Sequence, residues 1–147
     1  MDNTDHVLQW LPLIRSELQA YPEAGAHGLT LSRFAAQLWD ESRGGPHATS
    51  TYHKKDGSVG HARGLMQFTD DTWKDWGHGD PYDPQASIRA GIRYMTHFMK
   101  SYNDRWDEAL EAYYSGPGGV LKYPNVPADI KLYATHIINR EPLYRGL

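Results

Sequence analysis

The sequence has no cysteine, so disulfide bonds and thiol chemistry are excluded and the fold must rest on packing alone. It also lacks any apolar run approaching the roughly 20 residues that a membrane-spanning helix needs. Positive charge is not in excess: the 147 residues carry a net charge of -3. A protein that binds nucleic-acid phosphates normally presents a basic face, and a membrane-surface protein presents a basic amphipathic segment. We therefore predict one globular domain, residues 1–147, with neither nucleic acid nor membrane insertion as a partner.

Alternation of apolar and polar residues, the pattern of a half-buried strand, is also scarce. Arg43–Ala62 is rich in Gly, His, Ser, Thr and Lys and predicts a long polar loop, while "GHARGLMQF" has room for one short extended piece. Apolar residues recur at helical spacing in the segments 8–18, 31–41, 71–76, 84–102, 106–113 and 130–138. The sequence therefore predicts a mainly α domain with little or no β-sheet.

Helix starts are marked by side chains that accept hydrogen bonds from the first backbone NH groups of a helix. Thr30 precedes the second helical segment, and Asp83 precedes the longest one. Asp70 or Asp71 is the expected cap of the short segment that follows them. Asp56, followed by glycine, is typical of a turn.

Two adjacent acids, Asp40 and Glu41, end the apolar run of the second helical segment. At 3.6 residues per turn, Glu41 continues the stripe of Phe34 and Leu38, whereas Asp40 continues the polar side. A carboxyl group on an apolar face loses hydration, which raises its pKa toward neutrality and suits a general acid. Helix geometry alone favours the simpler interpretation, in which Glu41 lies at the edge of the stripe and reaches water.

Three blocks occur in a fixed order: Glu41-Ser42, "GLMQ" at 64–67 and "ALEAYYSGPGGV" at 109–120. In this order, on predicted helices, they make residues 8–135 resemble the soluble lytic transglycosylase (SLT) domain family of the lysozyme superfamily, which is related to goose-type lysozyme. The resemblance implies a lysozyme-like helical domain with a substrate cleft. It also implies cleavage of the β-1,4 bond between N-acetylmuramic acid and N-acetylglucosamine in peptidoglycan, without a cofactor.

The resemblance makes Glu41 the catalytic acid/base. It would protonate the glycosidic oxygen and then take a proton from the muramic 6-hydroxyl, closing a 1,6-anhydro ring. Because the nucleophile belongs to the sugar, no second carboxylate is required, unlike in the usual glycosidase. The positions carried over as substrate-binding are Ser42, Ser58, Gly64, Met66, Gln67, Tyr113 and Tyr114.

Several of these positions also have a purely structural interpretation. Tyr113 matches a family tyrosine whose hydroxyl group points toward the acid, and it also ends an apolar stripe. Tyr114 stands where asparagine is usual and Ser115 where alanine is usual, so the local hydrogen bonding is expected to differ. The segment between Glu41 and "GLMQ" is longer than the common family pattern, and Ser58 lies within it. The structural interpretation is that Ser42 ends a helix, Gly64 forms a turn and Met66 packs in the core.

Two alternatives remain open at this point. Goose-type lysozymes carry aspartates around "GLMQ" that position a water molecule; here Ser58 and Thr69 occupy those places. Asp56, Asp70 and Asp71 lie close by in sequence, so hydrolysis is the first alternative. An inactive peptidoglycan-binding module is the second, although a pure binder has no need of an acid on an apolar face.

The eight histidines do not predict a metal site, because no HExxH motif and no paired helical spacing are present. Even the three that share one segment, His47, His53 and His61, are expected to be solvated or to contact sugar. The tryptophans Trp10, Trp39 and Trp106 fit core positions. Flat rings that could stack on sugars occur near predicted loops, at Tyr52, Trp73, Trp76 and Tyr123.

The N-terminal stretch carries acids early and has no basic segment before its apolar run, unlike a Sec signal peptide. We therefore expect a monomer that reaches peptidoglycan strands of the bacterial cell wall, in the periplasm, by another route. A phage endolysin, a virion-borne lysin and an effector delivered by a secretion system all fit.

Overall fold

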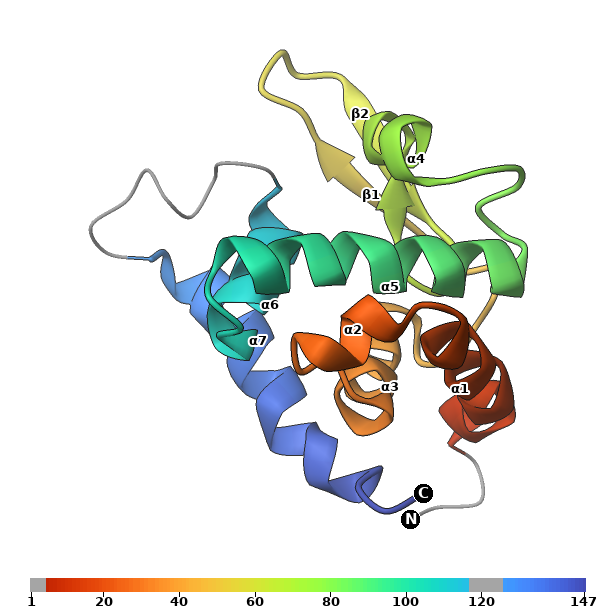
Figure 1. Cartoon of the computed structure of the whole chain (residues 1–147). Helices are drawn as coiled ribbons and strands as arrows, with labels where there is room; N and C mark the ends of the chain where they lie inside the picture. The colour runs from red at the N-terminus through yellow and green to blue at the C-terminus, as the bar shows by residue number, and fades with distance from the viewer. Residues whose placement is uncertain (1–4, 117–125) are drawn as a thin grey trace.

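The structure is a computed structural model that describes residues 5–116 and 126–147 (Figure 1). Figure 1 shows the long α5 crossing the molecule, with α1, α2 and α3 on one side and α4 and the strands on the other. The predicted mainly α fold is confirmed. The α-helices are α1 (Leu11–Ala20), α2 (Pro22–Ala26), α3 (Leu31–Ser42), α4 (Asp70–Trp76), α5 (Pro84–Ser101), α6 (Trp106–Ser115) and α7 (Ala128–Arg140). The 3-10 helix η1 (His6–Trp10) precedes α1, and the 3-10 helix η3 (Glu141–Leu143) follows α7.

The predicted long loop contains a β-hairpin. Strands β1 (Thr49–His53) and β2 (Val59–Arg63) are antiparallel, and the short β3 (Phe68–Thr69) pairs with β2. The prediction of a loop throughout this interval was therefore wrong, whereas the extended piece in "GHARGLMQF" is confirmed. Every residue of β1 is exposed, so this strand has no apolar face that could have produced an alternating pattern.

Helix capping follows the sequence with one exception. The side chains of Thr30 and Asp83 accept hydrogen bonds from the backbone NH group three residues further on and so begin α3 and α5. At α4 the cap is Thr69, and Asp70 and Asp71 lie in the first turn, near the positive end of the helix dipole. The prediction of an aspartate cap was wrong because α4 begins one residue earlier than expected.

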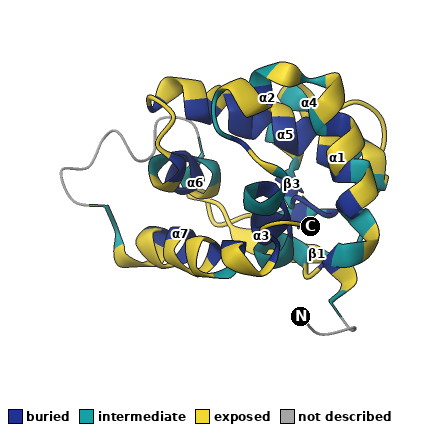
Figure 2. Ribbon diagram, turned by 60° about the horizontal axis from the view of Figure 1, so that its bottom comes forward, coloured by how far each residue is buried: buried dark blue, intermediate teal, exposed yellow. Residues whose placement is uncertain are grey.

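The core forms where the apolar faces of α1, α3, α5 and α6 meet (Figure 2). Burying one large apolar side chain of this kind contributes about 1.5–3 kcal/mol. Of the tryptophans predicted in the core, Trp106 is buried. Trp10 and Trp39 are partly buried and pack against the core. The largest fully buried side chains include Ile14, Phe34, Leu38, Ile88, Ile92, Met95, Met99 and Leu110.

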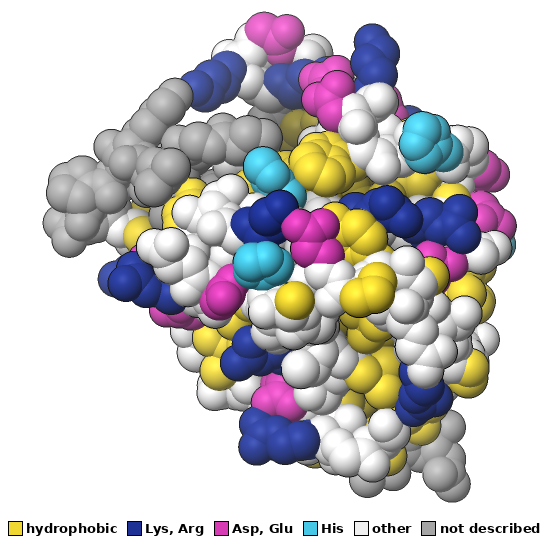
Figure 3. All heavy atoms as spheres, in the orientation of Figure 1, with side chains coloured by type: hydrophobic (Ala, Val, Ile, Leu, Met, Phe, Trp, Pro, Cys, Tyr) yellow, Lys and Arg dark blue, Asp and Glu magenta, His cyan; other side chains and the backbone are white. Residues whose placement is uncertain are grey.

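On the face drawn in Figure 3, basic and acidic side chains are interspersed rather than gathered into a field of one sign. Two ion pairs tie α5 to the N-terminal helices: Arg89 with Glu17 at 3.0 Å and Lys100 with Glu23 at 2.5 Å. This face therefore lacks the basic field that a phosphate backbone requires. Within the described residues, no helix is both long and apolar enough to cross a membrane.

Candidate active site

A cavity of about 660 Å³ lies against the C-terminal end of α3. Its volume is in the range typical of small-ligand sites. The three strands and helices α4, α5, α6 and α7 provide the other walls, so the cavity joins residues that are far apart in sequence. The lining residues are Asp40, Glu41, Ser50, Tyr52, Ala62, Gln67, Phe68, Thr69, Thr72, Tyr94, Tyr113, Tyr114, Ser115, Gly116 and Tyr133.

The last turn of α3 places Glu41 in the wall of this cavity. Desolvation raises the pKa of Glu41 to about 8; the neighbouring charge of Asp40 raises it too, while the hydrogen bond from Tyr133 opposes the shift. A carboxyl group with this pKa is protonated at neutral pH, which is the state that a general acid needs. The structure thus favours the shielded interpretation of Glu41 over the solvated one.

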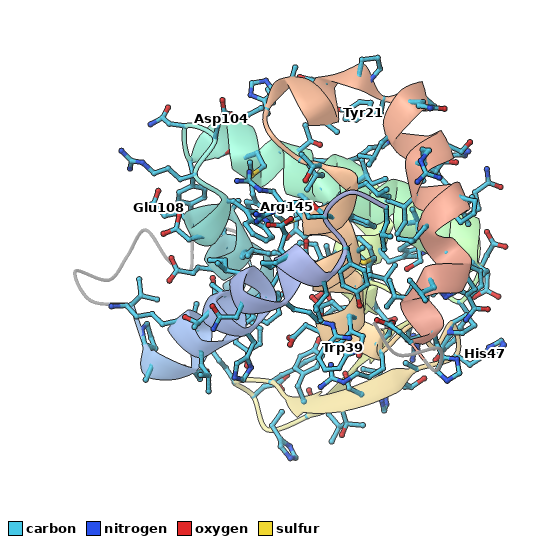
Figure 4. All side chains as sticks on the ribbon, turned by 90° about the horizontal axis from the view of Figure 1, so that it is seen from below. Tyr21, Trp39, His47, Asp104, Glu108 and Arg145 are labelled. Atoms are coloured by element: carbon cyan, nitrogen blue, oxygen red, sulfur yellow. The ribbon has the colours of Figure 1, made fainter. Side chains whose placement is uncertain are left out.

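The end of α3 that carries Glu41 is fixed by packing around Trp39 (Figure 4). The guanidinium groups of Arg43 and Arg140 lie 3.7 and 3.5 Å from the centre of the Trp39 ring system. Such cation–π contacts stabilise an arrangement by about 0.5–1 kcal/mol each where water reaches them. Arg43 adopts the left-handed conformation that ends α3, with a φ of 57°. The direction of Glu41 is therefore set by a well-packed helix end.

Tyr133, on α7, makes the closest contact with the acid. Its hydroxyl group donates a hydrogen bond of 2.5 Å to Glu41 Oε2 and accepts one of 3.3 Å from Gln37 Nε2. In the sequence, Tyr133 is simply one of the apolar residues at helical spacing in the segment 130–138. No local pattern reveals this contact, because the two residues are 92 positions apart.

Tyr113 and Tyr114 both line the cavity. The Tyr113 hydroxyl group donates a 2.7 Å hydrogen bond to the Met66 carbonyl oxygen. The hydroxyl group bound to the acid thus belongs to Tyr133, whereas that of Tyr113 is bound to a backbone oxygen, although the charge of Glu41 helps burial to raise the pKa of Tyr113. The ring of Tyr114 lies against Tyr133, with centroids 4.7 Å apart, and Tyr114 remains 51% exposed. Tyr114 thus covers the residue that holds the acid.

The "GLMQ" segment supports the floor of the cavity. Gly64 has a φ of +81°, and an added Cβ would lie 2.1 Å from the Pro81 carbonyl oxygen, so only glycine fits there. Met66 is fully buried, in agreement with its structural interpretation. Gln67 faces the cavity, but its side-chain amide donates to the Ala48 and Gly64 carbonyl oxygens at 3.0 Å. Gln67 therefore ties the start of the hairpin to this segment.

Four of the predicted substrate-binding residues do not line the cavity: Gly64 and Met66, described above, and Ser42 and Ser58. The Ser42 hydroxyl group donates to the Leu38 carbonyl oxygen at 3.3 Å and accepts from the Gly44 NH group at 3.2 Å, which is a helix-ending role. Ser58 lies at the exposed tip of the hairpin, bonded to Asp56. Ser58 therefore lies outside the lining of the cavity that holds Glu41.

The aspartates considered for hydrolysis are also outside the cavity. Asp56 lies at the exposed hairpin turn, as its sequence predicts, Asp70 is exposed and paired with Arg63, and Asp71 is exposed on α4. The second carboxyl group of the cavity instead belongs to Asp40, which the sequence placed on the polar side of its helix. Desolvation raises the pKa of Asp40 against the opposing charges of Arg43 and neighbouring residues.

The remaining candidates from the sequence are the aromatic rings considered for sugar stacking and the possible metal ligands. Of the rings considered for sugar stacking, Tyr52 lines the cavity, whereas Trp73 and Trp76 pack against the core. Tyr123 and part of the "SGPGG" turn lie outside the described residues. In the ranges 5–116 and 126–147, no group of three or more His, Asp or Glu side chains is arranged to hold a metal ion.

Comparison with known proteins identifies the family and agrees with the fold. A curated relative, membrane-bound lytic murein transglycosylase F of Klebsiella pneumoniae, is 31% identical over 150 residues, which cover 91% of this chain and 28% of the relative. The X-ray structure of an inactive mutant of lytic transglycosylase Slt from Pseudomonas aeruginosa shares the fold, with a TM-score of 0.62 at 22% identity over 88% of this chain and 23% of that one. This chain thus spans about a quarter of the length of each of these two proteins. Because residues 22–129 match the model of the transglycosylase SLT domain, the chain belongs to that family.

Proposed function

We propose that this chain is a peptidoglycan-cleaving muramidase, a lytic transglycosylase with Glu41 as its general acid/base. The observation that carries the proposal is a carboxyl group with a pKa of about 8 in the wall of a cavity. Glu41 is also the position to which the family resemblance assigns the acid. The names of the two compared proteins support this activity class, and in the Slt structure the inactive mutant replaces a glutamate with glutamine.

In the first step, protonated Glu41 donates its proton to the glycosidic oxygen between N-acetylmuramic acid and N-acetylglucosamine as the C1–O bond breaks. The resulting carboxylate then accepts the proton of the muramic 6-hydroxyl while that oxygen bonds to C1. The proton returns to Glu41, and no water is consumed. Tyr133 holds Oε2, so the other carboxyl oxygen is free to exchange the proton with the sugar.

The geometry supports this non-hydrolytic route over water activation. None of Asp56, Asp70 and Asp71 lines the cavity, and the one aspartate that does, Asp40, lies on the polar side of α3, next to Glu41 in sequence. A single carboxyl group is sufficient when the attacking hydroxyl belongs to the substrate itself. On this proposal the partner is the glycan strand, and the place of action is the bacterial cell wall.

The test is mass spectrometry of the fragments released from purified peptidoglycan. Products lighter by one water molecule than the hydrated sugars, and absent with Glu41→Gln, are expected. Glu108→Gln, an acid on α6 that does not line the cavity, is the matched control and keeps the activity. Reducing-end muramic acid would mean hydrolysis. No release by the unmutated chain would reject the enzyme proposal, and retained binding would then identify a glycan-binding module.

A further inference from the structure

One face of the β-hairpin forms a wall of the cavity. Ser50 and Tyr52 are two positions apart on β1, so their side chains point to the same face. Their antiparallel partners on β2 are Ala62 and Gly60, respectively. Ser50, Tyr52 and Ala62 all line the cavity with Glu41. Tyr52 is thus the one bulky side chain among these four positions on a wall otherwise built from small residues.

Gly60 determines how the Tyr52 ring lies. A Cβ atom added at Gly60 would be 2.4 Å from Tyr52 Cζ, 2.6 Å from its hydroxyl oxygen and 2.8 Å from Cε1. The outer end of the ring therefore rests on the backbone of Gly60, which it buries. The φ of Gly60 is outside the left-handed region, so its backbone conformation does not demand glycine. The space that glycine leaves is filled by the ring.

The ring is supported on one side and open on the other. Tyr52 is 38% exposed although its outer end covers Gly60. An exposed aromatic ring on a cavity wall offers an apolar face and a polar hydroxyl tip. A pyranose ring has the matching character, with an apolar C–H face and hydroxyl groups around its rim.

From this arrangement we infer that Tyr52 is a saccharide-stacking platform, held in place by Gly60, that binds a sugar unit of the glycan strand at a distance from the cleaved bond. The inference rests on the proposed function, because it takes the strand in the cavity to be peptidoglycan. Tyr52 comes from β1 and Glu41 from α3, so the two residues act on different parts of one ligand. Tyr52 is a substrate-binding residue and takes no part in proton transfer.

The test compares the cleavage of soluble peptidoglycan glycan strands of short and long defined length. Tyr52→Ala is expected to raise KM for long strands about tenfold and to change kcat less than twofold, because binding away from the reacting bond is lost. Tyr52→Phe keeps the ring and stays near the unmutated KM. Gly60→Ala displaces the ring and raises KM in the same direction. Thr51→Ala, on the opposite face of β1, is the matched control and changes neither constant.

The length dependence separates stacking from a general loss of structure. A disturbed hairpin would weaken the cleavage of all strands equally, whereas a lost platform weakens only strands long enough to reach it. An equal effect on both lengths, an effect on kcat alone or an unchanged KM for Tyr52→Ala would overturn the inference.

Binding distinguishes this inference from the proposed function. Co-sedimentation of the Glu41→Gln chain with insoluble peptidoglycan is measured with and without Tyr52→Ala. Binding that depends on Tyr52, together with no cleavage by the unmutated chain, would reject the enzyme and keep the platform. Cleavage with binding that is independent of Tyr52 would keep the enzyme and reject the platform.

Discussion

The hydroxyl oxygen of Tyr133 and Oε2 of Glu41 lie 2.5 Å apart, and this contact connects α7 to the last turn of α3. The same hydroxyl group accepts a hydrogen bond from Gln37 Nε2 at 3.3 Å. A tyrosine hydroxyl group has a single proton, and the bond accepted from Gln37 leaves that proton for Glu41. Two helices therefore fix one carboxyl oxygen of the acid.

Tyr133→Phe removes the contact that lowers the pKa of Glu41. The pKa then rises above its value of about 8, so the alkaline limb of the pH–rate profile moves to higher pH. The rate at neutral pH falls about tenfold, because the carboxyl group loses its orientation. Tyr21→Phe, which removes a hydroxyl bonded to Glu23 and lies outside the cavity lining, leaves the profile unchanged. An alkaline limb that does not move in Tyr133→Phe would contradict this role.

Glu41 also makes the stability of the fold depend on pH. Its folded pKa of about 8 exceeds the ordinary 4.5, so its contribution is fully present below pH 4.5 and is lost as pH rises to about 8. Glu41→Gln removes this loss. The free energy of unfolding, measured in urea, is compared between the variant and the unmutated chain. The difference, variant minus unmutated, should increase by up to about 1 kcal/mol for each pH unit between pH 4.5 and about 8. A constant difference across the window would show that Glu41 is not desolvated.

Alanine substitutions at two glycines with positive φ distinguish the cost of backbone strain from the cost of steric overlap. Gly64 and Gly57 have φ values of +81° and +87°, but only an added Cβ at Gly64 meets an atom, the Pro81 carbonyl oxygen. Gly57→Ala should lower the free energy of unfolding by about 1 kcal/mol, and Gly64→Ala by about 3 kcal/mol or more. Urea denaturation measures both. Equal losses would mean that the turn can move away from Pro81.

Asp40→Asn tests whether the second carboxyl group of the cavity takes part in the chemistry. The charge of Asp40 raises the pKa of Glu41, so its removal should move the alkaline limb of the pH–rate profile slightly to lower pH. The anhydro product should persist, with a rate reduced less than about tenfold. If Asp40 activated a water molecule, the rate would instead fall by about 100-fold or more. Product analysis and initial rates of the variant decide the matter.

The sequence by itself determined the α-helices except the short α2, because the repeat of apolar residues is a local property of each segment. It also determined the position of Glu41, which follows Phe34 and Leu38 along one helix face and is partly buried at the end of that face. The caps Thr30 and Asp83 were predictable for the same reason, since a cap acts on NH groups within three residues.

The tertiary structure alone decided what surrounds the acid. The hairpin had no predictive pattern because β1 is exposed throughout. The partner of Glu41 comes from another helix, 92 residues away, and a contact between distant segments leaves no periodic trace in either of them. Packing likewise turned Gln67 toward the backbone of Ala48 and carried Ser58 to the hairpin tip. The spacing of residues along one helix or strand determines which of its faces is apolar. Which polar groups line the same cavity is determined by how distant helices and strands pack together.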